Sequence, residues 1–184
     1  MVKEIITQNL ILRKARTDDL YSIWNNIWRD ERVAERMYWK PTQSKEEARD
    51  RLERSIRFQN DNDAFFICLK ETDEAIGMAG IREESEGIYH ESGICIAVKC
   101  QHRGYGRQVL DALLKIAFED KKGKAFIYSC LKDNEASRKL ALSGGLKYMN
   151  EETAIWEKDG SERVIENYIM TADDYYRERG DHHG

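Results

Sequence analysis

The stretch Glu91-Ser92-Gly93-Ile94-Cys95-Ile96, followed by Gln101-His102-Arg103-Gly104-Tyr105-Gly106, decides the fold. An apolar run leads into a loop with two glycines, and from Arg103 onward apolar residues recur at spacings of three and four, as in an amphipathic helix. A helix start presents backbone N–H groups and the positive end of the helix dipole. Gly104 and Gly106 let an anion approach without a Cβ in the way. The stretch predicts a strand, an anion-binding loop and a helix, although two such glycines can also serve only a tight turn.

The loop differs from the two common nucleotide-binding loops. A dinucleotide fingerprint needs another glycine spacing, and a P-loop ends in Gly-Lys-Ser/Thr, where this chain has Gly106-Arg107-Gln108. The sequence therefore favours neither NAD nor ATP as the bound anion.

Helices and strands alternate on both sides of this stretch. Ser44 to Glu47 has the spacing of a capping box, and the helix after Gly104 is expected to end at Lys121-Lys122-Gly123. The expected strands cover residues 10–12, 64–69, 75–81, 90–98, 125–131, 146–157 and 163–170, and the other expected helices start near residues 18, 44 and 134. This order predicts a mixed α/β fold with an antiparallel first half, one strand-helix-strand crossover from 90 to 131, and a terminal hairpin turning at Lys158-Asp159-Gly160.

Length and composition predict a single domain over residues 1–184. The 184 residues are 41% hydrophobic, enough for one buried core, and the one proline, Pro41, lies in no Gly/Ser-rich linker. The polar tail from about Tyr175 is expected to be frayed.

Charge and hydropathy exclude several function classes. The net charge of -4 gives no general attraction to nucleic acid. The N-terminus lacks the apolar core of a signal peptide, and no run is long enough to cross a bilayer, so a cytoplasmic protein without a membrane partner is expected. Cys68, Cys95, Cys100 and Cys130 form no Cys-x-x-Cys pair, and we interpret them as reduced core thiols with no metal role.

In combination, these motifs resemble the GNAT acetyltransferases. The core Gln101-x-x-Gly104-x-Gly106 is similar to the acetyl-CoA motif of that family. Thr7-x-x-Leu10-x-Leu12-Arg13, the glycines 77 and 80, and Asn134-x-x-Ser137 leading to Gly145-Leu146 resemble its RimJ/RimL-like branch, the ribosomal-protein N-terminal acetyltransferases. The likeness spans about residues 7 to 170. It implies an α+β GNAT fold, with a central, mostly antiparallel twisted sheet, splayed central strands and flanking helices, and acetyl-CoA as co-substrate.

The resemblance also assigns the cofactor-binding residues. In that family the pantetheine arm lies between the splayed strands, which here gives it the main-chain groups of Ile96, Ala97 and Val98. The pyrophosphate falls to Gln101, His102, Arg103, Gly104, Tyr105, Gly106 and Arg107. Asn134 is assigned to the cofactor as well. It is equally suited to be a helix N-cap, and both roles can hold.

Acetyl transfer to an amine requires a base and a source of a proton for the thiolate. The resemblance assigns the base to Glu91, whose alternative role is an exposed strand residue beside a cation. His90 is a rival on the opposite face of the strand. Many family members carry a tyrosine acid where this chain has Ala141, and Ser137 matches the serine of the RimJ/RimL-like pattern. That serine could instead bond to the backbone, and the thiolate could leave unprotonated.

The acceptor is expected to be a primary amine, attacked directly in a ternary complex. Trp28, Tyr38 and Trp39 lie in the region that walls the acceptor groove in this family, although such aromatic residues are more often core. A protein N-terminal α-amine and a small-molecule amine are both compatible with the sequence, as are a monomer and a homodimer. The alternative function is a non-catalytic module that senses acetyl-CoA.

Overall fold

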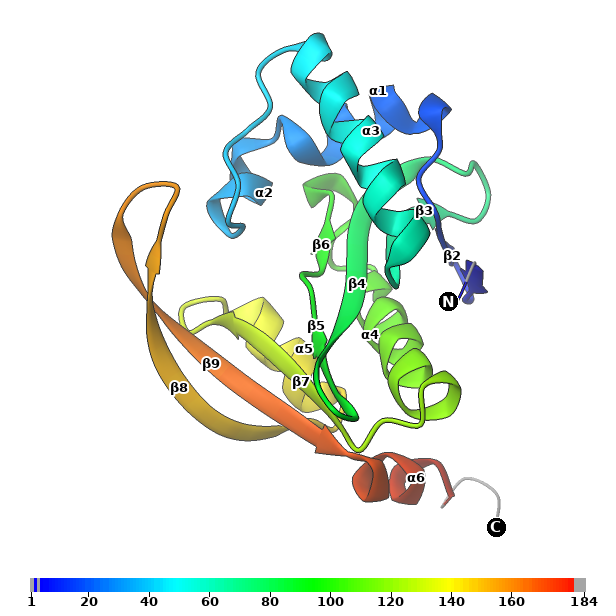
Figure 1. The fold of residues 1–184 in the computed structure, drawn as a ribbon, viewed down its shortest axis with the longest axis vertical. Helices are drawn as coiled ribbons and strands as arrows, with labels where there is room; N and C mark the ends of the chain where they lie inside the picture. Colours follow the sequence, from blue (N-terminus) through cyan, green and yellow to red (C-terminus); the bar gives the residue numbers. More distant parts are fainter. Residues whose placement is uncertain (1, 3, 181–184) are drawn as a thin grey trace. The chain divides into compact units, whose positions relative to one another are not determined.

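The computed structural model describes residue 2 and residues 4–180. The chain forms two compact units, Met1–Ile81 with Ser92–Ala112 and Arg82–Glu91 with Leu113–Gly184. Figure 1 shows the elements of both units. The expectation that the chain is one functional domain stays a prediction.

The first unit contains an antiparallel sheet. Its strands are β1 (Glu4–Ile6), β2 (Leu10–Arg13), β3 (Ala64–Leu69) and the first part of β4 (Ala75–Ser85), paired in that order. The short strand β6 (Cys95–Ile96) pairs with β4 through Gly77 and Met78. The helical segments are η1 (Thr17–Asp19), α1 (Leu20–Ile23), η2 (Trp24–Trp28), α2 (Glu31–Glu35), α3 (Lys45–Asp61), η3 (Val98–Cys100) and the start of α4 (Tyr105–Lys115).

Local sequence explains where these helices begin. Ser44 Oγ accepts a hydrogen bond from Glu47 N–H at 3.1 Å, which confirms the predicted start of α3. At the first helix the carboxylate of Asp19 accepts from Arg16 N–H at 2.7 Å. The same carboxylate forms a buried salt bridge with Arg13 at 2.7 Å, so this helix start is also tied to β2.

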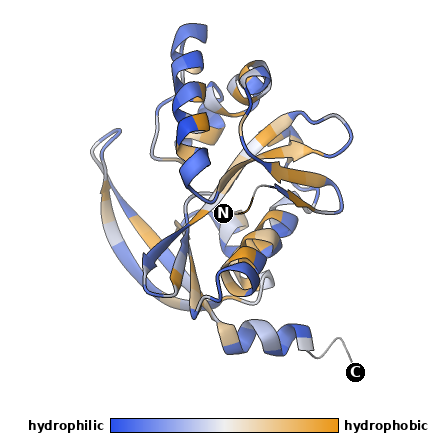
Figure 2. Ribbon diagram, turned by 45° about the vertical axis from the view of Figure 1, so that its right-hand side comes forward, coloured by the Kyte–Doolittle hydropathy of each residue, from blue (hydrophilic) through white to orange (hydrophobic). Residues whose placement is uncertain are grey.

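The core of the first unit lies between the sheet and its helices. Phe65, Phe66 and Ile67 of β3 are fully buried, and α3 contributes Ala48 and Leu52. In Figure 2 the long helix α3 is largely hydrophilic in colour, because only a narrow stripe of its surface packs on β3.

The second unit contains β5 (Ile88–Glu91), β7 (Ala125–Leu131), β9 (Ser161–Thr171) and β8 (Lys147–Trp156), paired in that spatial order. The β5–β7 pair is parallel and the other two are antiparallel, as the predicted crossover requires. The helical segments are η4 (Ile116–Asp120), α5 (Glu135–Ser143) and α6 (Ala172–Gly180). The predicted mixed α+β fold class is therefore confirmed.

Two expectations about local structure were wrong. The segment 90–98 is not one strand, because Gly93 takes φ +102° and the chain breaks between β5 and β6. The tail from Tyr175 is not frayed up to Gly180. The Tyr175 ring is 2% exposed, packs on Phe118 at a centroid distance of 4.6 Å, and donates its hydroxyl proton to Glu119 at 2.8 Å. Residues 181–184 lie outside the described residues.

Gly77 determines how closely β6 can approach β4. A Cβ at this position would lie 2.4 Å from the carbonyl oxygen of Cys95 and 2.9 Å from Ile67 Cδ1. Both distances are well below van der Waals contact, so any larger residue would displace β6 or the β3 side chain. The pairing that carries Cys95 and Ile96 therefore requires glycine at 77.

We expect Gly77→Ala to lower the free energy of unfolding by roughly 1–3 kcal/mol, the usual cost of overpacking a buried site. Gly180→Ala is the matched control, because no atom of the described residues lies within 4 Å of its added methyl group. Urea denaturation of the two variants measures the difference. Equal stabilities would show that β6 is not held against Gly77.

Candidate functional site

The loop before α4 is shaped by two residues in the left-handed region. After the short turn η3, His102 takes φ +60° and Gly104 takes φ +76°. Such residues can turn successive backbone N–H groups toward one side, which is the geometry of an anion-binding nest. A Cβ at Gly104 would have no atom of residues 2 and 4–180 within 4 Å, so the space beside this residue is open in the described part of the chain.

The start of α4 directs backbone N–H groups toward this loop. The bond from Gln108 N–H to Gly104 O, 3.3 Å long, is the first turn of the helix, so the preceding amides have no acceptor inside it. Gln108 also fixes the helix start. Its Oε1 accepts from Thr7 Oγ1 at 2.7 Å and from Asn9 N–H at 3.0 Å, and its Nε2 donates to Asn9 Oδ1.

The main-chain groups predicted to bind pantetheine are partly engaged. Ala97 N–H donates to Ile76 O at 2.7 Å, and Ile96 O accepts from Gln101 Nε2 at 3.0 Å. Val98 lies in η3 and not in an extended strand. Residues 96–98 therefore lead from β6 into the loop, and the Gln101 side chain braces the turn between them.

Two arginines bring positive charge to the loop. Arg103 is exposed on the loop itself. Arg107 Nε contacts both carboxylate oxygens of Asp111, one helical turn later, at 2.9 and 3.0 Å. Because Arg107 is already paired with a carboxylate, Arg103 is the better candidate for an added anion.

In the second unit, His90 and Glu91 lie on opposite faces of β5, as strand alternation predicts. Glu91 is 8% exposed, whereas an exposed strand residue was the alternative to its catalytic role. His90 lies on the other face in a row of polar side chains. Its Nδ1 is 2.9 Å from Arg82 Nη2, its Nε2 is 2.7 Å from Ser129 Oγ, and Ser129 Oγ donates to Asn167 Oδ1 at 2.5 Å.

The Arg82 contact assigns the tautomer of His90. A guanidinium can only donate, so Nδ1 accepts and the proton sits on Nε2, which donates to Ser129. Burial lowers the pKa of His90, and the charge of Arg82 lowers it further. Both ring nitrogens are therefore engaged in the row, which makes His90 the weaker candidate for the base.

Ser137 lies among polar groups on the Glu91 side of β7. Its Oγ is 2.5 Å from the hydroxyl of Tyr128, and its N–H donates to Asn134 Oδ1 at 3.3 Å. Asn134 is thus the N-cap of α5, one of its two predicted roles. Burial raises the pKa of Tyr128, and the charge of Glu91 raises it further, so this hydroxyl keeps its proton and lies within electrostatic reach of Glu91.

Tyr128 was missed by the sequence analysis, as was Gln108. Period-two alternation along the strand 125–131 would have placed Tyr128 and Cys130 on the face opposite Ser129. The pairing with Ser137 could not have been found, because it depends on how α5 packs on β7.

The predicted substrate residues separate into buried and accessible ones. Trp28 is fully buried, stands edge-on to Phe66 with 6.0 Å between ring centroids, and donates Nε1–H to Met78 Sδ at 3.3 Å. Trp28 therefore belongs to the core, which is the alternative that the sequence left open for these aromatic residues. Tyr38 is 65% exposed and Trp39 is half-buried, so both are accessible.

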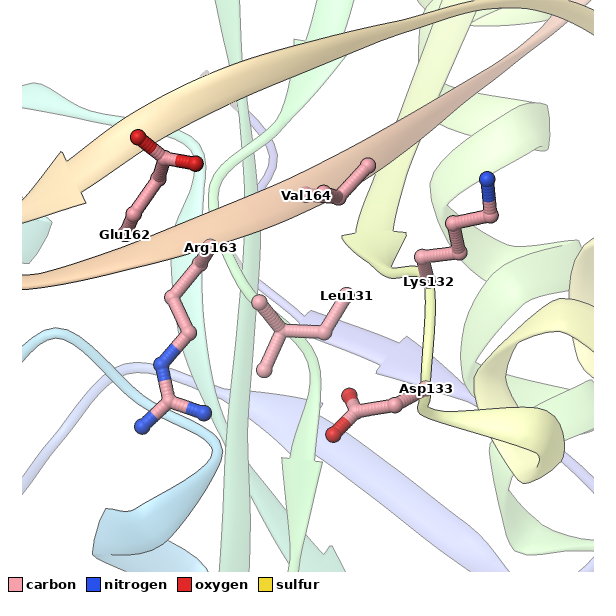
Figure 3. Close-up of a pocket in the computed structure, with 6 residues that line it drawn as sticks. All are labelled: Leu131, Lys132, Asp133, Glu162, Arg163 and Val164. Atoms are coloured by element: carbon pink, nitrogen blue, oxygen red, sulfur yellow. The ribbon is translucent and has the colours of Figure 1, made fainter.

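A separate pocket of about 340 Å³ lies in the second unit where β7 ends beside β9 (Figure 3). It is lined by Leu131, Lys132, Asp133, Glu162, Arg163 and Val164. Lys132 is paired with Glu151 at 2.7 Å, and the Nε of Arg163 donates to Ser161 at 3.0 Å. The pocket contains none of the predicted site residues, so we do not take it as the active site.

Within residues 2 and 4–180, no group of three or more His, Cys, Asp or Glu side chains is arranged to hold a metal ion. No helix in the same residues is long and apolar enough to span a bilayer. All four cysteines are buried thiols, as expected.

Comparisons with known proteins give matches to one family. A family model described as "Acetyltransferase (GNAT) domain" matches residues 9–147. No curated protein matches the chain. Among solved structures, a GNAT-family acetyltransferase from Bacillus anthracis superposes with a TM-score of 0.79 at 16% identity, covering 92% of this chain and 99% of that one.

Two further solved structures have more specific descriptions. A putative ribosomal-protein-serine acetyltransferase from Vibrio cholerae has a TM-score of 0.75 at 22% identity, with 91% and 97% of the two chains covered. Spermidine N-acetyltransferase from Vibrio cholerae, in complex with CoA and spermine, has a TM-score of 0.74 at 17% identity, with 92% and 99% covered. At these identities the likeness shows a shared fold alone.

The lowered pKa of His90 gives a testable pH dependence. In the unfolded chain His90 takes up a proton below about pH 6.5, whereas in the folded chain its lowered pKa keeps the ring neutral to lower pH. The contribution of neutral His90 to the free energy of unfolding is therefore present above about pH 6.5 and is lost as the pH falls below it. We expect His90→Gln to reduce the loss of unfolding free energy between pH 7 and 5. The same slope in His90→Gln and the wild type would contradict the assignment.

Proposed function

The chain belongs to the GNAT acetyltransferase family and is an N-acetyltransferase, and from this premise we propose that it transfers the acetyl group of acetyl-CoA to a primary amine in a ternary complex. The observation that carries the proposal is the loop 101–107. There, two left-handed residues, a helix start and an open space beside Gly104 combine into a site for an anion.

In this proposal the loop binds the pyrophosphate of acetyl-CoA. The amides at the start of α4 donate to its oxygens, and Arg103 adds charge. The main chain of residues 96–98 binds the pantetheine arm. An amide of that arm bonding to Ile96 O would share this acceptor with Gln101 Nε2, so we expect the Gln101 side chain to move when the cofactor binds.

During the reaction the attacking amine loses one proton, and the departing CoA thiolate gains one. The nitrogen attacks the thioester carbonyl, the C–N bond forms, and the C–S bond breaks as CoA leaves. We propose that the carboxylate of Glu91 acts as the base and accepts the proton from the amine. Its buried position is consistent with a functional carboxylate. The coupling of the Glu91 charge to Tyr128 supports placing both in one reaction centre.

Ser137 is the proposed proton source for the departing thiolate, and the cycle closes when Glu91 releases the amine proton to solvent and Ser137 takes up a proton from solvent. Tyr128 is then a positioning residue. When the Tyr128 hydroxyl donates to Ser137 Oγ, the serine hydroxyl proton is not used in that bond and is free to donate to the thiolate. The 2.5 Å contact also fixes the serine rotamer. The raised pKa of Tyr128 keeps the donor protonated throughout the neutral range.

The acceptor is the finer part of the proposal. One structural neighbour is described as acting on a ribosomal protein and another on spermidine, which supports an amine as the acceptor class. The RimJ/RimL-like branch, the choice between a protein N-terminus and a small molecule, the oligomeric state and the cytoplasmic location stay predictions.

Gly104→Ala tests the cofactor loop. The added methyl group of this variant contacts no described protein atom, but it occupies the space proposed for the anion. It also strains the backbone of residue 104, which is in the left-handed region. We expect acetyl-CoA affinity to fall by roughly tenfold or more, the scale of one charge-assisted hydrogen bond. Calorimetry with acetyl-CoA measures the loss.

Gly160→Ala is the matched control for this variant. Gly160 has φ +71° and also has nothing within 4 Å of an added Cβ, so its backbone strain is comparable. Both variants should lose similar stability, and only Gly104→Ala should lose affinity. Unchanged affinity in Gly104→Ala would mean that the cofactor binds elsewhere.

Glu91→Gln tests the chemistry. We expect turnover, followed as CoA release over a panel of amines and peptides, to fall much more at neutral pH than at high pH, where the amine no longer needs a base. Acetyl-CoA affinity measured by calorimetry should stay unchanged. An identical pH–rate profile would remove Glu91 from the mechanism. Binding of acetyl-CoA without turnover on any amine would instead favour a sensing module.

A further inference from the structure

Arg51 of α3 is clamped between two tryptophan rings in the first unit. Its guanidinium carbon lies 4.8 Å from the ring centroid of Trp28 and 4.3 Å from that of Trp39. Trp28 is fully buried, whereas Trp39 and Arg51 are half-buried. The stack therefore has a core wall and an accessible wall, with the charged group between them.

Thr42 fixes the position of the guanidinium. Thr42 Oγ1 accepts from Arg51 Nη1 at 3.0 Å, while Thr42 N–H donates to Trp28 O at 2.7 Å. Thr42 O in turn accepts from Trp24 Nε1 at 3.1 Å. Thr42 is 1% exposed, so the segment before α3 is pinned to η2 and holds the arginine in one place.

Among the described residues, no carboxylate forms a salt bridge with Arg51, although the charge of Glu47 acts on it from a distance. Within residues 2 and 4–180 the bond to Thr42 is the one hydrogen bond of this guanidinium, and it forms no salt bridge. A guanidinium carries five N–H donors, so most of its donor capacity is unused. Glu47, one turn earlier on α3, directs a carboxylate oxygen to Gln43 N–H at 2.9 Å instead.

This charge is maintained at neutral pH although it is desolvated. Burial lowers the pKa of Arg51 to about 10, and the nearby charge of Arg54 adds to the effect. The charge of Glu47 opposes this lowering but forms no salt bridge with Arg51, so the half-buried cation is only partly compensated, and an anion that binds directly against it gains more than it would in water. The group is therefore poised to accept an anionic ligand.

The charge of Arg51 extends to the strand that leads into the loop 101–107. Cys95 of β6 is within electrostatic reach of Arg51, and the next residue is Ile96. The segment that carries Trp39 approaches the same region, because the methyl group of Met37 lies 3.3 Å from the position of a Cβ on Gly93. An anion on Arg51 would thus lie near the main chain that we assign to pantetheine.

We propose that Arg51 binds the carboxylate of the acetyl acceptor, so that the enzyme selects amines that also carry an acidic group. The inference rests on the proposed function and narrows its substrate class. Two N–H groups of the guanidinium would meet the carboxylate in a bidentate pair, with Trp39 covering the ligand from the accessible side. Polyamines, which lack a carboxylate and carry further positive charges, should be poor acceptors.

The experiment compares acceptors that differ only in the carboxylate. L-leucine, L-phenylalanine and L-glutamate are each paired with the α-carboxamide, and peptides beginning Ala-Glu with peptides beginning Ala-Gln. The amino acid pairs test whether Arg51 binds a free α-carboxylate, and the peptide pairs test whether it binds an acidic side chain. We expect kcat/KM of the wild type to favour the acid by roughly tenfold or more in one arm, mostly through KM.

Arg51→Met keeps an unbranched side chain between the rings and removes the charge, and it should reduce this preference to about one. Arg54→Met is the control, because it removes a neighbouring exposed positive charge and should keep the preference. Arg51→Lys is a second variant that tests the assignment if Arg51→Met fails to fold. It retains a cation without the bidentate fork, so the preference should be weakened but still present.

A second measurement does not depend on turnover. Tryptophan fluorescence of the wild-type protein should change on titration with N-acetyl-L-leucine and not with its carboxamide, and this difference should be absent in Arg51→Met. Acetylation of acid and amide at equal rates, or a preference that survives in Arg51→Met, would overturn the Arg51 assignment and leave the proposed function intact. Acetyl-CoA binding without acetylation of any amine would contradict the proposed function, and the fluorescence difference would still decide the role of Arg51.

Discussion

The close approach of β6 to β4 is the constraint on which the proposed cofactor-binding loop of this enzyme depends. The carbonyl of Cys95 lies where a Cβ of residue 77 would stand, so the pairing exists only because that residue is glycine. From β6 the chain enters the turn of η3, then the left-handed residues of the loop and the start of α4. A two-residue strand thus sets the position of every amide proposed to bind acetyl-CoA.

Strand alternation divides the second unit into two chemical faces. On one face His90, Ser129 and Asn167 form a continuous hydrogen-bonded row in which each polar atom is satisfied by its neighbour. On the other face Tyr128 contacts Ser137 and is influenced by the charge of Glu91. The first row is consistent with a structural role, because both nitrogens of its histidine are engaged. The second face brings a carboxylate and two hydroxyls together.

Two arginines of the first unit, Arg13 buried and Arg51 half-buried, show how differently the same side chain can be used. Arg13 forms salt bridges with Asp19 at 2.7 Å and Asp73 at 2.6 Å, so its charge is neutralised within the protein and ties β2 to the neighbouring turns. Arg51 is held by aromatic rings and a single hydroxyl. Rings position a guanidinium without neutralising it, so the charge stays available to a ligand.

The sequence alone determined most of the order of elements, the mixed α+β class and the position of a turn between Gln101 and Arg107, because apolar periodicity, capping residues and glycines act over a few neighbouring positions. It could not place Tyr128 on Ser137 or Arg51 between Trp28 and Trp39, since these contacts join residues from different elements. Because burial also depends on packing between elements, the sequence could not decide between a substrate role and a core role for Trp28, whose ring is fully buried. Side-chain partners across elements are decided by packing, which only the tertiary structure supplies.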